Sequence, residues 1–243
     1  MLNRAYELRY QVYCLERGFL SPKSYPNGRE FDQHDDESAH FGAYHRGDEL
    51  VGYVRLVQPT EGPFPFQHHC AGLLRDIGLP SARESAEVSR LMLRKEYRAQ
   101  RHDQQQPGEV GSILLQLYRR MYLYSIENDL RYWYAAMEKS LARQLQRSSF
   151  MFKQISPETD YYGPVALYLA DLRDIEAQLA RRNPRLLEWL REPEATGLDA
   201  AASTWQIRHL PRPSVRSAHR ERPHPPLNGL QRRPSGQSHA VAA

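Results

Sequence analysis

Two alternating segments on either side of a short turn constrain the fold of this chain most strongly. In residues 40–45 and 50–57, large apolar side chains alternate with small or polar ones, and Arg46-Gly47-Asp48 lies between them. A period of two on both sides of a Gly/Asp turn predicts a β-hairpin. Arg55 shares a face of the second strand with three large side chains, so its charge is expected to point inward.

An inward guanidinium needs a carboxylate partner, and an acidic cluster lies directly upstream of the hairpin. It consists of Glu30, Asp32, Asp35 and Asp36. Burying either sign of charge alone would cost on the order of several kcal/mol. Two interpretations stay open, a structural ion pair beneath the hairpin and a site for a charged substrate.

Apolar spacing beyond the hairpin indicates a mixed fold. A period near 3.6 predicts helices over 3–17, 110–128 and 140–148, and over 174–192 with an interruption at Pro184. Alternation predicts strands over 84–97, 131–137, 150–156 and 165–172. Because the long helix 110–128 must cross over between neighbouring strands, we expect an α/β or α+β sandwich over residues 1–193.

Charge is concentrated at the end of the chain. The residues from Gln206 onward hold seven arginines, one acid and six prolines, which gives them +6 of charge when the whole chain carries +4. Such a composition lacks the means to form a core, so a Pro/Arg-rich disordered tail is expected over 194–243. A basic tail could bind an anionic surface, but a solvated extension is the alternative, and no specific nucleic-acid partner is expected.

The remaining composition bounds the compartment and the chemistry. Two cysteines do not make a disulfide framework, and no signal peptide or apolar run of membrane length is present. A cytoplasmic protein without a transmembrane segment is therefore expected. No second pair of metal ligands stands at a fixed spacing from His68-His69-Cys70, so no metal site is expected. His34, His40 and His45 are expected at surface or hairpin positions.

A second group of charges lies on the strand predicted over 84–97. Glu87 and Arg90 fall on opposite faces of a regular strand unless a bulge intervenes. The helix that follows begins with small residues, so the N–H groups of its first turn could approach phosphate oxygens. A carboxylate held beside an arginine can accept a proton from an amine, so these features suit acyl transfer from a pantetheine-bearing donor.

Several motifs occur in a fixed order along the chain. They are Arg9-Tyr10-Gln11-Val12-Tyr13, Phe19, Glu30-x-Asp32-x-x-Asp35, Val51-Gly52-x-x-Arg55-Leu56 and Glu87-x-Ser89-Arg90. This set resembles the acyl-homoserine lactone (autoinducer) synthases. The stretch LRYQVYCLERGFL is more similar to their relatives, the N-acyl amino acid synthases and the PEP-CTERM/exosortase-associated acyltransferases. The resemblance covers residues 5–93 and implies a GNAT-like fold, a central mixed sheet flanked by helices. The first strand of that fold, which precedes the first helix, is expected to be missing here.

The resemblance also implies roles for individual residues. Glu87 would be the general base and Arg90 its orienting partner. The amine substrate would be bound by Arg9, Tyr13, Phe19, Asp32, Asp35 and Arg55, where Phe19 replaces a tryptophan of the autoinducer synthases. The acyl chain and the pantetheine arm would be received by Leu91, Leu93, Gly108, Gly111 and Ser112.

The donor implied by the resemblance is acyl-carrier protein or acyl-CoA, with no permanently bound cofactor. A basic rim of Arg94, Lys95, Arg98 and Arg101 could steer an acidic carrier protein, and a solvated loop of mixed charge is the alternative. The leading hypothesis is an N-acyltransferase that makes long-chain N-acyl amino acids or a related acylated amine. The competitors are an acyl-homoserine lactone synthase that uses S-adenosylmethionine and an inactive homologue that binds through its basic tail.

Overall fold

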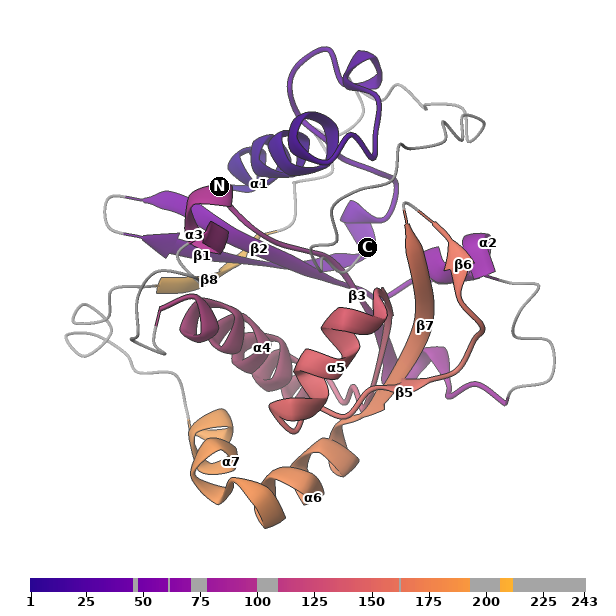
Figure 1. The fold of residues 1–243 in the computed structure, drawn as a ribbon, viewed down its shortest axis with the longest axis vertical. Coiled ribbons are helices and arrows are strands. Elements are labelled where there is room, and N and C mark those ends of the chain that lie inside the picture. Colours follow the sequence, from indigo (N-terminus) through magenta and orange to yellow (C-terminus); the bar gives the residue numbers. More distant parts are fainter. Residues whose placement is uncertain are drawn as a thin grey trace.

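A computed structural model describes residues 1–45, 48–60, 62–70, 78–99, 109–161, 163–192 and 206–211. One central sheet runs through this part of the chain (Figure 1). Its strands follow the order β5-β7-β4-β3-β2-β1-β8, and β6 pairs with β7 beside this path. The bounds are β1 Ser38–His45, β2 Glu49–Val57, β3 Ser85–Leu93, β4 Tyr132–Met137, β5 Lys153–Gln154, β6 Thr159–Asp160, β7 Pro164–Asp171 and β8 Gln206–Leu210.

Helices cover both faces of the sheet (Figure 1). One face carries α1 Leu2–Arg9, which continues as a π-helical segment, Tyr10–Glu16. The opposite face carries α4 Glu109–Glu127, α5 Lys139–Arg147, α6 Leu172–Arg182 and α7 Pro184–Arg191. The short helices are α2 Pro65–Cys70 and α3 Lys95–Ala99. None of the helices that the structure describes is long and apolar enough to cross a membrane.

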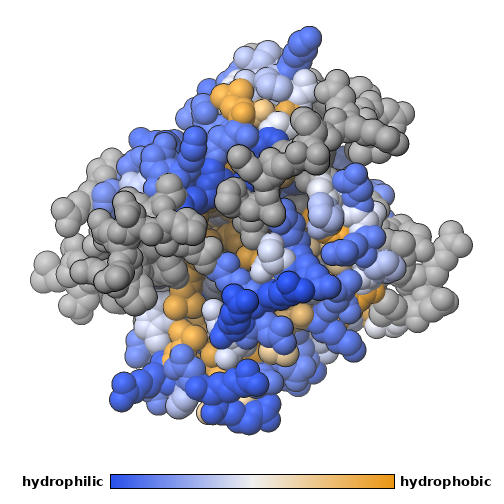
Figure 2. All heavy atoms as spheres, in the orientation of Figure 1, coloured by the Kyte–Doolittle hydropathy of each residue, from blue (hydrophilic) through white to orange (hydrophobic). Residues whose placement is uncertain are grey.

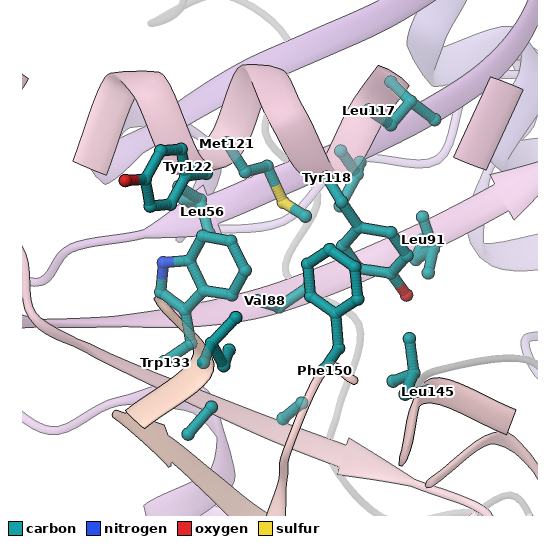
Figure 3. Close-up of a cluster of buried hydrophobic side chains, with 14 of the residues drawn as sticks. Leu56, Val88, Leu91, Leu117, Tyr118, Met121, Tyr122, Trp133, Leu145 and Phe150 are labelled. Atoms are coloured by element: carbon teal, nitrogen blue, oxygen red, sulfur yellow. The ribbon is translucent and has the colours of Figure 1, made fainter. Parts of the chain in front are cut away.

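The larger core lies between α4 and the sheet. Figure 3 shows Trp133 of β4 facing Met121 and Tyr122 of α4, with Phe150 against Tyr118. The Trp133 indole N–H donates to Ser125 Oγ at 2.9 Å, so this buried polar group keeps a partner. Each large apolar side chain buried here contributes about 1.5–3 kcal/mol, which is what holds the crossover helix against β3 and β4.

The predicted hairpin and crossover are confirmed. β1 and β2 pair antiparallel. β3 pairs parallel with β4, and α4 connects the two strands in the sequence. The strand predicted over 84–97 ends at Leu93 because α3 begins at Lys95, and the strand predicted over 150–156 is reduced to β5. A GNAT-like arrangement with a central mixed sheet flanked by helices is therefore present.

The prediction that everything after residue 193 is a disordered tail is wrong for Gln206–Leu210. These residues form β8 and pair antiparallel with β1, from Tyr44 opposite Gln206 to His40 opposite Leu210. Ile207 packs on the larger core, whereas Leu210 is buried in the cluster beneath α1. The strand forms because its alternating side chains find apolar surface on both faces of the sheet.

Candidate active site

A β-bulge on β3 sets the geometry of the site. Tyr53 pairs with Met92 and Arg55 with Ser89, so Arg90 and Leu91 together lie opposite a single residue of β2. Arg90 has a φ of 57°, in the left-handed region that residues with a Cβ seldom adopt. The bulge breaks the alternation of the strand and brings Arg90 towards the acidic cluster, where it contacts Asp32, which Arg55 also contacts.

Three arginines and three carboxylates form a buried ionic network. Arg9 donates from Nε to Glu30 Oε2 at 2.5 Å and from Nη1 to Asp35 Oδ1 at 2.5 Å. Arg55 binds Asp32 through both of its terminal nitrogens, each at 2.7 Å, and reaches Asp35 Oδ1 at 2.7 Å. The partner that the hairpin required for Arg55 is therefore present in the acidic cluster.

Arg90 completes the network from β3. Its Nη2 lies 3.1 Å from Glu30 Oε1 and 3.2 Å from Asp32 Oδ2. Burial alone would raise the pKa of Glu30, but Arg9 and Arg90 outweigh it and lower that pKa to about 2. Burial likewise opposes ionisation of Asp32, and the charges of Arg55 and Arg90 hold its pKa well below the usual range. Glu30 and Asp32 are therefore ionised at neutral pH.

Glu87 stands apart from these pairs. It is buried, and its Oε2 accepts a hydrogen bond from the backbone N–H of Phe66 at 3.0 Å. Burial raises its pKa to about 7, although the Phe66 N–H and the charges of Arg55 and Arg90 favour the ionised form. A carboxyl group that titrates near neutral pH is suited to general-base catalysis.

The prediction that Arg90 orients Glu87 is not supported by the geometry. Arg90 forms its ion pairs with Glu30 and Asp32, and the hydrogen bond to Glu87 comes from Phe66 instead. The reason is the bulge, which turns Arg90 towards the acidic cluster. The guanidinium also lies 4.9 Å from the centre of the Tyr13 ring, which in turn lies 5.6 Å from the Phe19 ring.

The structure thus brings most of the predicted amine-binding residues together around Arg90. Arg9 and Tyr13 come from the first helical stretch, Asp32 and Asp35 from the loop before β1, and Arg55 from β2. Sequence reasoning left Glu30 out of the site, although it is the carboxylate that joins Arg9 to Arg90. Its place in the Glu30-x-Asp32-x-x-Asp35 motif was the signal that could have included it.

The predicted acyl and pantetheine residues lie elsewhere in the fold. Leu91 and Leu93 are buried in the larger core. Gly111 and Ser112 lie in the first turn of α4, and Gly108 falls outside the described residues. β3 pairs with β4 only over Ser85–Glu87, so the ladder between the two parallel strands ends at Glu87.

Two of the four residues of the predicted basic rim form contacts within the protein. Arg94 donates from Nε to the carbonyl oxygen of Leu50 at 2.6 Å, and Arg98 pairs with Glu16. Lys95 is exposed, and Arg101 lies outside the described residues. These contacts hold α3 against the hairpin and the π-helical segment, so they weaken the case for a docking rim at this place.

The fold, in which the pairing of β3 and β4 ends at the buried carboxyl of Glu87, is GNAT-like. Residues 8–105 match the family described as an acetyltransferase (GNAT) domain.

Among solved structures, the chain is similar to the CoA-dependent acyl-homoserine lactone synthase BjaI, with 21% identity, 74% of this chain and 81% of that chain covered, and a TM-score of 0.56. It is also similar to TofI, at 22% identity, 76% and 91% coverage and a TM-score of 0.56. The N-acyl amino acid synthase FeeM is less similar, with 18% identity, 66% and 87% coverage and a TM-score of 0.46. At their identities, the likeness to BjaI and TofI establishes a common fold.

Proposed function

We propose that this protein is an N-acyltransferase that moves a long-chain acyl group from a thioester to the amine of an amino acid. The observation that carries the proposal is Glu87, a buried carboxyl whose pKa lies near 7 at the point where β3 and β4 cease to pair. In the ionised form it accepts a proton from the amine, directly or through water. The nitrogen then attacks the thioester carbonyl, the C–S bond breaks, and the thiolate leaves and takes up a proton.

The charged network supports a zwitterionic amine substrate. Asp32 and Arg90 are its most exposed members, with 24% and 15% of their side-chain surface accessible, and they lie 3.2 Å apart. A partly exposed carboxylate beside a partly exposed guanidinium complements the ammonium and carboxylate groups of an α-amino acid. Their ion pairs with Arg55 and Glu30 fix both side chains before the substrate arrives.

S-adenosylmethionine carries the same amino-acid head group, so an acyl-homoserine lactone synthase is the second candidate. The fold shared with BjaI and TofI favours it. Phe19, which replaces the expected tryptophan in the pair with Tyr13, favours a different amine. The two candidates differ in their product, an open N-acyl amino acid or a lactone.

The surface of α5 supports a donor that is strongly anionic. Lys139, Arg143 and Arg147 recur every four residues on its exposed side, and no acid lies within the helix. Figure 2 shows hydrophilic side chains gathered over α5. A basic stripe of this kind attracts an acidic carrier protein more strongly than it attracts the smaller CoA molecule, because it can meet several carboxylates at once.

The deciding experiment supplies the purified protein with a long-chain acyl-carrier protein or acyl-CoA and with either a panel of amino acids or S-adenosylmethionine. Mass spectrometry identifies the product. We expect an N-acyl amino acid as the product of the wild type, formed far more slowly by Glu87→Gln. Glu84→Gln, at an exposed position three residues upstream, is the control and should form it at the wild-type rate. A lactone would establish the second candidate.

If no combination gives a product, acyl transfer is refuted and a binding role through the basic residues after position 211 becomes the better interpretation. Exosortase genes beside the gene for this chain would favour the PEP-CTERM-associated subfamily.

A further inference from the structure

His40 is buried in β1 behind the charged network. Its side chain has no exposed surface, and both ring nitrogens have partners. Nε2 lies 2.9 Å from the carbonyl oxygen of Asp35, and Nδ1 lies 2.7 Å from the Tyr53 hydroxyl. Because a carbonyl oxygen only accepts, Nε2 must carry the proton, and Nδ1 therefore accepts from the Tyr53 hydroxyl. These contacts fix the tautomer and the orientation of the ring.

The residue that His40 holds is central to the network. Asp35 Oδ1 accepts from Arg9 and Arg55, while Oδ2 accepts from the backbone N–H of Asp32 at 2.7 Å. The hydrogen bond from His40 to the Asp35 carbonyl thus anchors the backbone of the loop before β1. The Asp35 carboxylate in turn holds the backbone N–H of Asp32 in place. Tyr53, the other partner of His40, also contacts the network, because the centre of its ring lies 5.9 Å from the Arg9 guanidinium.

The C-terminal strand closes this region at the edge of the sheet. Leu210 is the β8 partner of His40, is fully buried and packs in the same cluster as Tyr53. Arg208 secures the strand through an ion pair with Asp48 at 2.5 Å and lies 4.6 Å from the centre of the Tyr44 ring. Leu210 therefore covers the edge of β1 beside His40.

We propose that His40 is a positioning residue for the amine-binding network, and that Leu210 of the C-terminal strand keeps water from it. The amine-binding part rests on the proposed function. The His40 ring is surrounded by Asp35, Arg9, Arg55 and Tyr53. Burial lowers the pKa of His40 to about 4, although the charge of Asp35 favours the protonated ring. The imidazole is therefore neutral at physiological pH and acts through geometry, without exchanging protons with the substrate.

Substitutions at His40 test the positioning role. Gln can still donate to the Asp35 carbonyl, whereas Leu removes both hydrogen bonds. We expect His40→Leu to raise the KM for the amine at least tenfold, with His40→Gln in between and the KM for the thioester donor nearly unchanged. Ile126→Ala, at an exposed position on α4, is the control. An unchanged amine KM in His40→Leu, or an equal rise for both substrates, would refute the role.

A measurement independent of activity separates this inference from the proposed function. NMR of the imidazole nitrogens should show His40 neutral with Nε2 protonated at pH 6 in the wild type, and a growing protonated fraction in Leu210→Ser. Should that variant fail to fold, Leu210→Ala is examined by amide exchange, and the β1 amides beside β8 are expected to exchange at least tenfold faster. A protonated His40 in the wild type, or unchanged exchange in Leu210→Ala, would overturn the proposal even if acyl transfer is observed.

Discussion

Replacing Glu87 with glutamine should make the protein more stable and less active at the same time. The carboxyl has a pKa of about 7 in the folded chain against an ordinary value of 4.5. A glutamine keeps an oxygen that can accept the Phe66 N–H but has no charge to bury. Glu87→Gln therefore removes a buried ionisable group while preserving its shape.

The size of the stability effect follows from the pKa shift. Each pKa unit corresponds to 1.36 kcal/mol, so the shift from 4.5 to about 7 amounts to about 3 kcal/mol. Because the folded-state pKa is raised, the protonated carboxyl stabilises the fold fully below pH 4.5, and this stability is lost as the pH rises through 7. Glu87→Gln should thus match the wild type in unfolding free energy near pH 4.5 and exceed it by about 3 kcal/mol at pH 8.5.

Urea unfolding at several pH values measures this difference, and kcat/KM over the same range measures the cost in catalysis. The wild-type rate should rise to a plateau above pH 7, and Glu87→Gln should be about 100- to 10,000-fold slower, as expected for the loss of a general base. Glu84→Gln should change neither quantity. Equal pH dependence of stability in the wild type and Glu87→Gln would show that Glu87 is not buried as described, and an unchanged rate would refute its role as the base.

Three further substitutions test other parts of the structure. Gly42→Ala should lower the unfolding free energy, measured by urea titration, by about 1–3 kcal/mol, because the new Cβ would lie 2.8 Å from Leu50 Cδ1. Gly78→Ala is the control: its Cβ would meet nothing within 4 Å, so the unfolding free energy should not change. Asp32→Asn should raise the amine KM at least tenfold and leave the donor KM unchanged in steady-state kinetics, since it removes one charge of the zwitterion site. Arg143→Glu should raise the KM for acyl-carrier protein several-fold at low salt and leave acyl-CoA unaffected; an equal effect on both donors would exclude α5 as the docking surface.

Local periodicity was sufficient to predict the hairpin, the long helix and the crossover. The partner of Arg55 was also predictable, because an inward charge restricts the choice to the nearest acidic cluster. The bulge at Arg90 was not, since alternation in a sequence of mixed polarity does not reveal where one extra residue enters a strand. The assignment of Arg90 to Glu87 failed for that reason.

Residues whose environment depends on distant segments were missed. His40 lies on the hairpin, as one of the two expected positions allowed, but its burial was not predicted, because it depends on Tyr53 of β2, which contacts its ring, and on Leu210 of β8, which pairs with it. β8 could not be predicted from composition, because its five residues adjoin a segment rich in arginine and proline that is typical of a disordered tail. The strand is stabilised by pairing with the edge of β1, which the composition does not reveal. In both cases the contact partner lies far away in the sequence.

The contrast between Glu87 and the network explains how one site can keep several carboxylates ionised and one of them titratable. Glu30 forms ion pairs with two arginines and Asp32 with three, and these charges overcome the effect of burial and hold both pKa values low. Glu87 is buried as deeply, but its one hydrogen-bond donor is an uncharged backbone N–H, so burial prevails and raises its pKa. Groups whose pKa values are driven apart in this way are suited to different roles, and in the proposed function Glu30 and Asp32 would bind and orient the substrate while Glu87 would move a proton. The same reasoning requires that Arg90 belong to the network, because a direct ion pair with Glu87 would lower the pKa of the base and weaken it.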